Sequence, residues 1–323
     1  MSTVAGNRSW MHFRSGANTK DSSENETIDF WLAKLAKKRA LKDTANKDLF
    51  RHTFDSLAGI YGLLTANDKF LADQQSASAI NLVAKKGGTG KKNKVWIIGA
   101  HYDTVESSPG ANDNASGLSV MIEVMRQVSG HKWFDEIWFV AFDMEEAGLL
   151  GSKAFVQHLA IEDRERIVGM INLDMLGGIT ETPNSQSIPP GFEEAFPGIV
   201  DAVKEDENRG DFSVVVANDA AFNMITSLNE QMYEIAPDLK SAMIVLSKEG
   251  EQINELRRSD HASFWDMGLP ALHIGDGADT RNSFYHSERD VPANVSTEHL
   301  GKIARVLVGF LMKNAGPIPD GGG

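Results

Sequence analysis

The chain has 323 residues, of which 41% are hydrophobic and 24% are charged, and its formal net charge is −13. This length and composition are typical of a globular protein with one large α/β domain or two small ones. The acidic balance argues against nucleic acids and anionic membranes as partners, because both bind clustered lysine and arginine side chains. The absence of cysteine excludes disulfides, thiolate metal ligands and cysteine nucleophiles.

The N-terminal segment, residues 1–26, is polar, and we expect it to form a flexible arm. It contains no apolar stretch of the kind found in secretory signals, and no apolar run approaches the roughly 20 residues that span a bilayer. The sequence as written favours the cytoplasm and predicts no transmembrane segment, whereas a leader removed in maturation would place the protein outside the cytoplasm. Residues 27–316 are expected to form one domain, and residues 317–323 a flexible tail.

Apolar residues between positions 28 and 64 recur at helical spacing and predict two helices. Two β-branched segments follow, residues 78–85 and 94–100, with a glycine-rich turn between them, which predicts a β-hairpin. The glycine-rich turn has neither the spacing nor the strand-to-helix position of a phosphate-binding loop, so we do not assign it that role.

Further along the chain, predicted strands and helices alternate. The predicted strands are 136–142, 167–175, 211–218, 242–247 and 269–276, and the predicted helices are 118–128, 147–159, 220–236 and 295–314. Such alternation is typical of an α/β fold, here a single three-layer domain with a mostly parallel central sheet and helices on both faces. Residues 176–211 are rich in glycine, proline and serine, and we expect an inserted loop or flap there.

Histidines and acids stand where the predicted strands end. They are His101 and Asp103 after strand 94–100, Glu145 and Glu146 after strand 136–142, Asp174 near the end of strand 167–175, and His286 after the last strand. In an open parallel α/β sheet, ligands bind beyond the carboxyl ends of the strands, so we expect these side chains on one rim. Imidazoles combined with carboxylates suit a divalent metal such as Zn²⁺, and a pair of metals can share one carboxylate. Asp113, in a tight turn that opens helix 118–128, is the candidate for a shared ligand.

Each of these residues taken alone has a simpler explanation. A histidine after a strand is more often hydrogen bonded than a metal ligand, and the pair Glu145–Glu146 alone resembles a solvated helix start. Their combination favours a site, because a carboxylate that ends a buried strand needs a partner to offset its desolvation. Among the other histidines, we interpret His273 as a hydrogen-bonded core residue, whereas His261 either supports Asp260 or only packs.

Six segments, in this order along the chain, resemble the M28 family of dizinc aminopeptidases: HYDT, GANDNASG, MEEAGLLGS, NLDM, RRSDHASFW and RNSFYHSERD. The resemblance covers about residues 78–312 and leaves the arm, the first helices and residues 176–211 without a match. It implies the fold of the zinc-dependent exopeptidases. It also implies a metalloaminopeptidase, similar to bacterial leucyl-type enzymes, that acts on peptides with a free N-terminus.

The resemblance further implies two zinc ions per chain and a ligand set for each. His101 and Asp174 would hold one ion, Glu146 and His286 would hold the other, and Asp113 would bridge the two.

Other residues of the same segments would support the reaction. Glu145 would be the general base, and Tyr285 would donate to the developing oxyanion. Asp103 would accept the second N–H of His101, and Asp260 would have a similar supporting role. The family's peptide bond after the bridging acid is often cis, so we expect a cis bond at Asp113–Asn114.

Three alternatives stay open at the level of the sequence. Glutaminyl-peptide cyclotransferases have a similar scaffold with one zinc ion, but their last histidine follows a tryptophan, and here it follows Tyr285. A carboxypeptidase or dipeptidase-like relative would need an arginine at its pocket, for which Arg257, Arg258 and Arg281 are candidates. A non-enzymatic relative would be expected to lose ligands, and this chain keeps all five together with the base.

Overall fold

The computed structural model describes residues 2–4, 7–12, 22–71, 78–90, 94–247, 250 and 253–319. The strands of its main sheet are β1 (Ser2–Val4), β2 (Asn7–His12), β3 (Leu64–Leu71), β4 (Ser78–Lys86), β5 (Val95–His101), β7 (Glu136–Phe142), β8 (Ile167–Leu173), β9 (Ser213–Asn218), β10 (Ser241–Leu246) and β11 (Ala271–Gly275). Two short strands, β6 (Lys132–Trp133) and β12 (Pro317–Ile318), pair separately. The helices are α1 (Ser22–Leu35), α2 (Thr44–Ile60), α3 (Gly117–Ser129), α4 (Leu150–His158), α5 (Ile161–Arg166), α6 (Phe192–Ala195), α7 (Pro197–Glu205), α8 (Phe222–Ile235), α9 (His261–Asp266) and α10 (Thr297–Asn314).

The described strands form a ten-stranded sheet in the order β1-β2-β10-β9-β11-β8-β5-β7-β4-β3. Its centre, β11, β8, β5 and β7, is parallel throughout, and β9 and β10 form a further parallel pair that runs antiparallel to β11. Antiparallel strands complete both edges. Parallel neighbouring strands have their carboxyl ends at the same edge of the sheet. The candidate site residues follow these strand ends and therefore lie at that edge.

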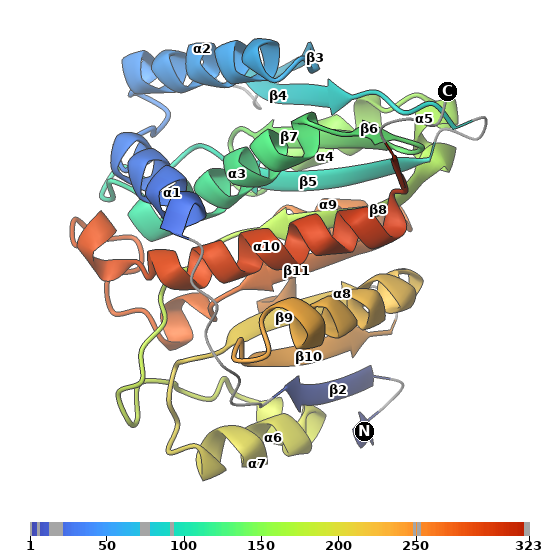
Figure 1. The fold of residues 1–323 in the computed structure, drawn as a ribbon. Helices are drawn as coiled ribbons and strands as arrows, with labels where there is room; N and C mark the ends of the chain where they lie inside the picture. Colours follow the sequence, from blue (N-terminus) through green and yellow to red (C-terminus); the bar gives the residue numbers. More distant parts are fainter. Residues whose placement is uncertain are drawn as a thin grey trace.

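Helices cover both faces of the sheet (Figure 1). One hydrophobic core lies under α1, α2, α3, α8 and α10, and a second lies under α4, α7 and α9 on the opposite face. This arrangement explains why β5 reads VWIIGAH and is buried at every position: a strand covered on both sides needs apolar residues on both sides. The predicted three-layer α/β fold is therefore confirmed. Among the described helices, none combines the length and apolar character that crossing a membrane requires.

The predicted hairpin between residues 78–85 and 94–100 is wrong. Strand β7 lies between β4 and β5, antiparallel to the first and parallel to the second. The antiparallel neighbour on the other side of β4 is β3, a strand that the sequence did not predict. Most residues of β3 are exposed, so the strand lacks the alternation of apolar and polar residues that would reveal it. A short link between two strands indicates a hairpin only when no third strand of the sheet pairs between them.

The N-terminal segment also differs from the expected flexible arm. Asn7–His12 forms β2, which pairs antiparallel with β10, so the expectation is wrong for these residues. Residues 13–21 lie outside the described part of the chain. The segment 176–211 includes the helices α6 and α7, and its role as an insertion stays a prediction.

Candidate active site

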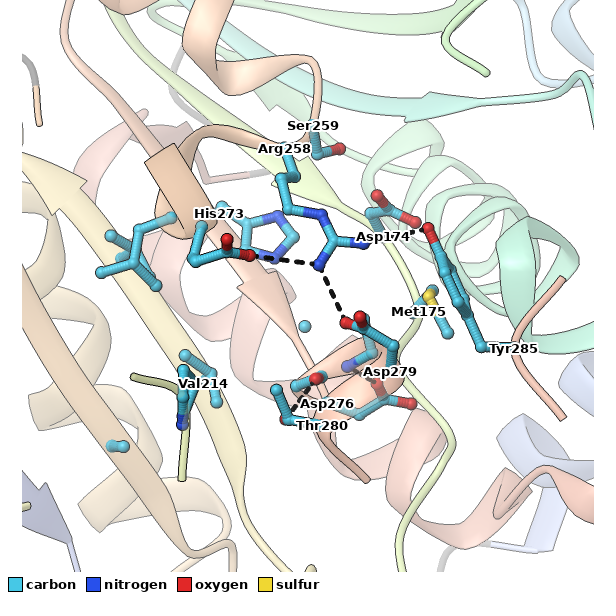
Figure 2. Close-up of a pocket in the computed structure, with 18 of the residues that line it drawn as sticks. Asp174, Met175, Val214, Arg258, Ser259, His273, Asp276, Asp279, Thr280 and Tyr285 are labelled. Carbon is cyan, nitrogen blue, oxygen red and sulfur yellow. Dashed lines mark hydrogen bonds and ion pairs between the residues drawn. The ribbon is translucent and has the colours of Figure 1, made fainter. Parts of the chain in front are cut away.

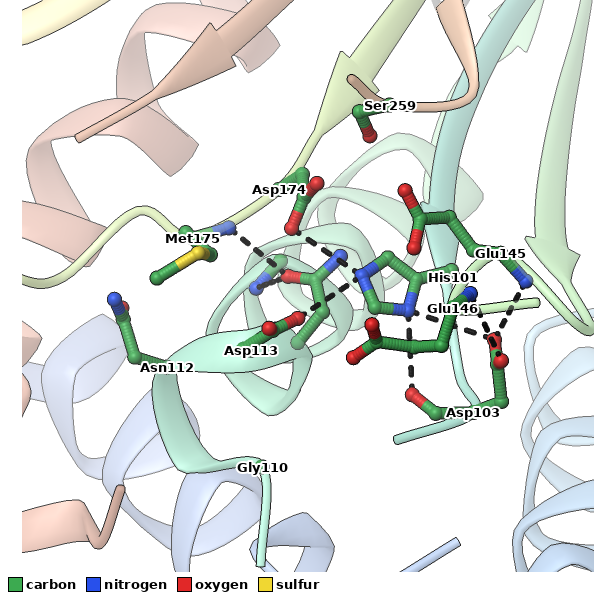
Figure 3. Close-up of polar contacts among 12 residues, drawn as sticks. His101, Asp103, Gly110, Asn112, Asp113, Glu145, Glu146, Asp174, Met175 and Ser259 are labelled. Atoms are coloured by element: carbon green, nitrogen blue, oxygen red, sulfur yellow. Dashed lines mark hydrogen bonds and ion pairs between the residues drawn. The ribbon is translucent and has the colours of Figure 1, made fainter. Parts of the chain in front are cut away.

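The end of β5 brings His101 toward two acids from other parts of the chain. His101 Nε2 lies 3.2 Å from Asp174 Oδ1, and Asp174 directly follows β8. The same nitrogen lies 3.2 Å from Asp113 Oδ1, in the turn that precedes α3 (Figure 3). The parallel pairing of β5 with β8 explains this convergence, because both strands end at the same edge.

A second group of the same kind lies beside the first. His286 Nε2 is 3.2 Å from Asp113 Oδ2 and 3.1 Å from Glu146 Oε2. Asp113 thus directs one carboxylate oxygen toward each histidine, as a bridging ligand would. The ligand atoms of Asp113, Glu146 and His286 lie within 4.8 Å of one another, and so do those of His101, Asp174 and Glu145. The structure therefore brings together all five expected ligands and the expected base.

Sharp turns aim these side chains. Met144, Met175 and His286 have φ values of 59°, 54° and 54°, so the chain turns in the left-handed region next to Glu145, next to Asp174 and at His286. Gly110, with φ 67°, allows the turn before α3, since a Cβ there would lie 2.5 Å from the carbonyl oxygen of Asp113. The Asp113–Asn114 peptide bond is cis, as the resemblance led us to expect.

Asp103 joins two of the converging loops. Its carboxylate accepts the main-chain N–H groups of Glu145 at 3.0 Å and of Glu146 at 3.2 Å. We expected this carboxylate to accept the second N–H of His101. Instead, His101 Nδ1 lies 3.2 Å from the main-chain carbonyl of Asp103 and 3.6 Å from its carboxylate. The carboxylate therefore fixes the two glutamates, and the carbonyl orients the imidazole.

Two further acids are buried behind the site. Asp260 is fully buried, and burial raises its pKa to about 7, with His101 acting in the opposite direction. Asp290 accepts the main-chain N–H groups of Asn112 at 2.7 Å and of Asp113 at 3.1 Å, and burial raises its pKa to about 6. Sequence reasoning did not assign Asp290, although it stands four residues after His286 in the same quoted segment.

The electrostatics of the cluster show what it requires. Burial acts to raise the pKa of Asp113, but the imidazoles of His101 and His286 hold it below its usual range. Burial and the neighbouring Asp113 raise the pKa of Glu146 to about 7. Burial lowers the pKa of His286, whereas Glu146 and Asp113 outweigh this effect and raise it to about 10. The buried carboxylates thus draw positive charge toward them, which a divalent cation would supply in place of protons.

Two buried atoms of the cluster agree with binding of a metal ion. Glu146 Oε1 is buried and has no hydrogen-bond partner, and buried His286 Nε2 forms no hydrogen bond with the carboxylates that lie 3.1 Å and 3.2 Å from it. Buried polar atoms without partners are rare, because each loses its contacts with water. Imidazole nitrogen and carboxylate oxygen are also the ligands that Zn²⁺ accepts in the absence of cysteine. The geometry, the unpartnered atoms and the donor types agree with a site for divalent cations.

A cavity of about 470 Å³ opens from this cluster. Its far part is lined by apolar residues of α7, β9 and β10. Figure 2 shows Arg258 among the residues that line it, and its guanidinium lies 2.8 Å from Asp279 Oδ1 and 3.3 Å from the Tyr285 hydroxyl. The other two arginines considered above do not line the cavity: Arg281 is bonded to the Gln186 side chain and the carbonyl of Phe212, and Arg257 pairs with Asp266.

His261, which the sequence left undecided, lies beside His273, with the two rings stacked at 4.8 Å between centroids. His261 Nε2 lies 3.0 Å from the carbonyl of Leu256, and its ring packs against Trp265, so it has a packing role. His273 Nδ1 lies 3.2 Å from the Asn172 side chain, as expected for a hydrogen-bonded core residue, but both His273 and His261 also line the cavity. The sequence did not indicate this second property, because the neighbours of β11 decide which side chains face the cavity.

Comparisons with known proteins identify the family. The sequence model of peptidase family M28 matches residues 81–311. Aminopeptidase YwaD of Bacillus subtilis is 43% identical over 109 residues, which are 34% of this chain and 24% of YwaD.

Among solved structures, a zinc aminopeptidase from Bacillus subtilis is similar with a TM-score of 0.56 and 26% identity, over 74% of this chain and 51% of that one. A glutaminyl cyclase from Fimbriiglobus ruber shares the fold, with a TM-score of 0.63 and 17% identity over 92% of this chain and 98% of that one. The chain thus spans about a quarter of YwaD and half of the zinc aminopeptidase. The match to most of its length confirms the resemblance: the chain belongs to peptidase family M28.

Proposed function

We propose that this protein is a zinc-dependent aminopeptidase that hydrolyses the first peptide bond of peptides with a free N-terminus. The position of Asp113 supports this proposal most strongly, since its two carboxylate oxygens lie 3.2 Å from His101 Nε2 and 3.2 Å from His286 Nε2. Such an arrangement suits a pair of cations that share one carboxylate. The aminopeptidases among the similar proteins support the same assignment.

Two zinc ions would be held by the five ligands. His101 and Asp174 would bind one ion, Glu146 and His286 the other, and Asp113 both. Bound there, zinc would polarise the scissile carbonyl and lower the pKa of a water molecule.

Glu145 has the position and the surroundings of a general base. It is only 8% exposed, and burial raises its pKa well above the usual range, although His101 acts in the opposite direction. A raised pKa lets a carboxylate take a proton from water and later return it to the leaving amine. The N–H that Glu145 donates to Asp103 fixes the main chain, so that its side chain points toward the ligands of the first group.

Tyr285 would stabilise the oxyanion that forms at the scissile carbonyl. Its side chain lines the cavity next to His286, with the two rings stacked at 3.7 Å between centroids. Arg258 Nη2 donates to the phenolic oxygen at 3.3 Å, which leaves the phenolic proton free to point toward the substrate.

The charge of the cavity favours a substrate ammonium over a substrate carboxylate. The acids that line it are Asp113, Glu145, Glu146, Asp174, Glu255, Asp276 and Asp279. Within the described residues, Arg258 is the one lysine or arginine among its lining side chains, and Asp279 already pairs with it. Two bound zinc ions would offset four of these seven negative charges and Arg258 one more, and the acids that remain in excess would favour a peptide amino terminus over a C-terminal carboxylate. This observation favours an aminopeptidase over the carboxypeptidase-type alternative.

Metal analysis combined with a substrate panel tests the proposal. We expect two zinc ions per chain and hydrolysis of aminoacyl-anilides that have a free amine. Activity should be lost with a chelator and restored by zinc. Equal rates on N-acetylated anilides, or release of C-terminal residues, would contradict the proposal. Formation of pyroglutamate from glutaminyl peptides without hydrolysis would support a glutaminyl cyclase instead.

A further inference from the structure

Helix α2 contacts the strand end that carries the two glutamates, although it lies before the residues that match the family. The point of contact is Asp143, which directly follows β7 and stands two residues before Glu145. Asp143 is completely buried. A buried carboxylate needs strong partners, and α2 provides two of them.

The partners of Asp143 hold both of its oxygens. Oδ1 pairs with the ammonium of Lys47, itself only 4% exposed, and accepts the N–H of Met144 at 3.0 Å. Oδ2 lies 3.0 Å from Arg51 Nη2 and 2.9 Å from the Tyr102 hydroxyl. Charged donors on both oxygens fix the position and the orientation of a carboxylate. We call Lys47, Arg51 and Asp143 the α2 latch.

The same part of the chain also holds the loop after β5. Arg51 Nε donates to the Tyr102 hydroxyl at 2.9 Å, and Tyr102 lies between His101 and Asp103. Just before α2, Arg39 Nε donates to the carbonyl of Tyr102 at 2.5 Å. The loops that follow β5 and β7 are therefore anchored to one helix and its preceding turn.

We propose that Lys47 and Arg51 are positioning residues for Glu145. They hold Asp143 in place, and the position of Asp143 determines where the turn at Met144 places the side chain of Glu145. The inference rests on the function proposed above. Met144, with a φ of 59°, forms the turn between Asp143 and the two glutamates. A change in the backbone angles at Asp143 would therefore move both glutamates away from the cluster. A misplacement of about 1 Å at a catalytic group can lower the rate by about 100-fold. Without Lys47, Asp143 would also be left with part of its buried charge uncompensated.

The test replaces Lys47 with methionine, which keeps the length of the side chain and removes its charge. In the full chain at saturating zinc, Lys47→Met should lower kcat on a free-amine aminoacyl-anilide by about 10- to 100-fold, with KM within about twofold of wild type. Leu57→Ala is the matched control, because Leu57 is a buried residue of α2 outside the latch. It should reduce the free energy of unfolding and leave kcat within about twofold.

A double substitution separates positioning from general stability. Lys47 acts through Asp143, so Lys47→Met should change kcat by less than about twofold when Asp143→Asn is already present. Lys47→Arg, which retains the charge, should restore most of the activity that Lys47→Met loses. Equal kcat values for Lys47→Met and Leu57→Ala, or independent effects of Lys47→Met and Asp143→Asn, would overturn the inference.

Zinc affinity gives a readout that does not depend on turnover. Glu146 follows the same turn, so Lys47→Met should weaken apparent zinc binding by about 10-fold, whereas Leu57→Ala should not. If the wild-type chain hydrolyses no free-amine anilide, the proposed function fails and this affinity decides the role of the latch. Unchanged zinc affinity in Lys47→Met would then overturn the inference by itself.

Discussion

Adjacent glutamates in this protein meet different surroundings. Glu146 Oε2 lies 3.1 Å from His286 Nε2, in the second ligand group, whereas Glu145 lies with His101 and Asp174 in the first. Both main-chain N–H groups are held by Asp103, so a single acid fixes the direction of the two side chains. These different neighbours are the basis for the two roles proposed above, Glu146 as a ligand and Glu145 as a base.

Replacing Glu145 with glutamine tests this division. The amide keeps the size of the side chain but cannot take a proton, so kcat should fall by more than about 100-fold. Zinc content should stay at the wild-type level, and stability should not fall, because burial already disfavours the ionised form of Glu145.

Glu165→Gln, an exposed residue of α5, is the matched control for kcat and should behave as wild type. His101→Ala should lower zinc content instead. Wild-type turnover by the Glu145→Gln variant would remove Glu145 from the mechanism.

Helix α10 shows how an element distant in sequence supports the sheet. It packs against α3, α8 and α1 on one face. His299 Nε2 lies 2.9 Å from Ser213 Oγ, at the first residue of β9. Burial lowers the pKa of His299 to about 3. The charged groups that act on it are Lys302 and Arg281, which lower the pKa further, and Asp238 and Glu298, which raise it.

His299 makes the stability of the fold dependent on pH. Its pKa is about 3 in the folded chain and about 6.5 in an unfolded one. The contribution of neutral His299 is therefore complete above about pH 6.5 and declines as the pH falls toward 3, by about 2 kcal/mol at pH 5.

Denaturant unfolding of the wild type and of His299→Gln at pH 7.5 and pH 5 measures this contribution. The wild type should lose about 2 kcal/mol more than the variant over this interval, since glutamine can contact Ser213 without taking a proton. Parallel losses in the two proteins would show that His299 does not titrate in this way.

The molecule as a whole concentrates negative charge at one edge of its sheet. Its formal net charge is −13, and six buried or half-buried acids surround His101 and His286. They are Asp103, Asp113, Glu145, Glu146, Asp174 and Asp260. Hydrophobic cores on both faces of the sheet hold these acids close together despite their repulsion. A bound cation would therefore stabilise the whole fold as well as the site.

Removing metal should lower the stability of the entire molecule. A ligand present at 100 times its dissociation constant adds about 2.7 kcal/mol to the free energy of unfolding. Thermal unfolding should therefore occur at a clearly lower Tm with a chelator than with zinc. His101→Ala should show a smaller difference between the two conditions. A wild-type Tm that is the same in both conditions would argue against a metal in this cluster.

The sequence by itself determined the α/β class, the family and the six residues expected as ligands and base, although it did not indicate Asp290 behind them. Apolar runs with acids or histidines at their ends, such as IWFVAF before Asp143, are local patterns, and the parallel sheet brings those ends to one edge. Asp276 ends β11 in the same way and would have been found by the same rule. The predicted ligands and base converge in the structure, but their catalytic roles remain predictions.

Tertiary structure alone decided the position of β7 between β4 and β5, the exposed strand β3 and the pairing of β2 with β10. It also decided that the Asp103 carboxylate holds the two glutamates, and that Lys47 of α2 meets Asp143. Local patterns cannot show such contacts, because the two residues of each contact are far apart in the chain. Several strands or side chains could fill the same place, and only the packing of the whole chain decides which one does. A sequence records which residues need a partner, and the packing of the whole chain decides which partner each one receives.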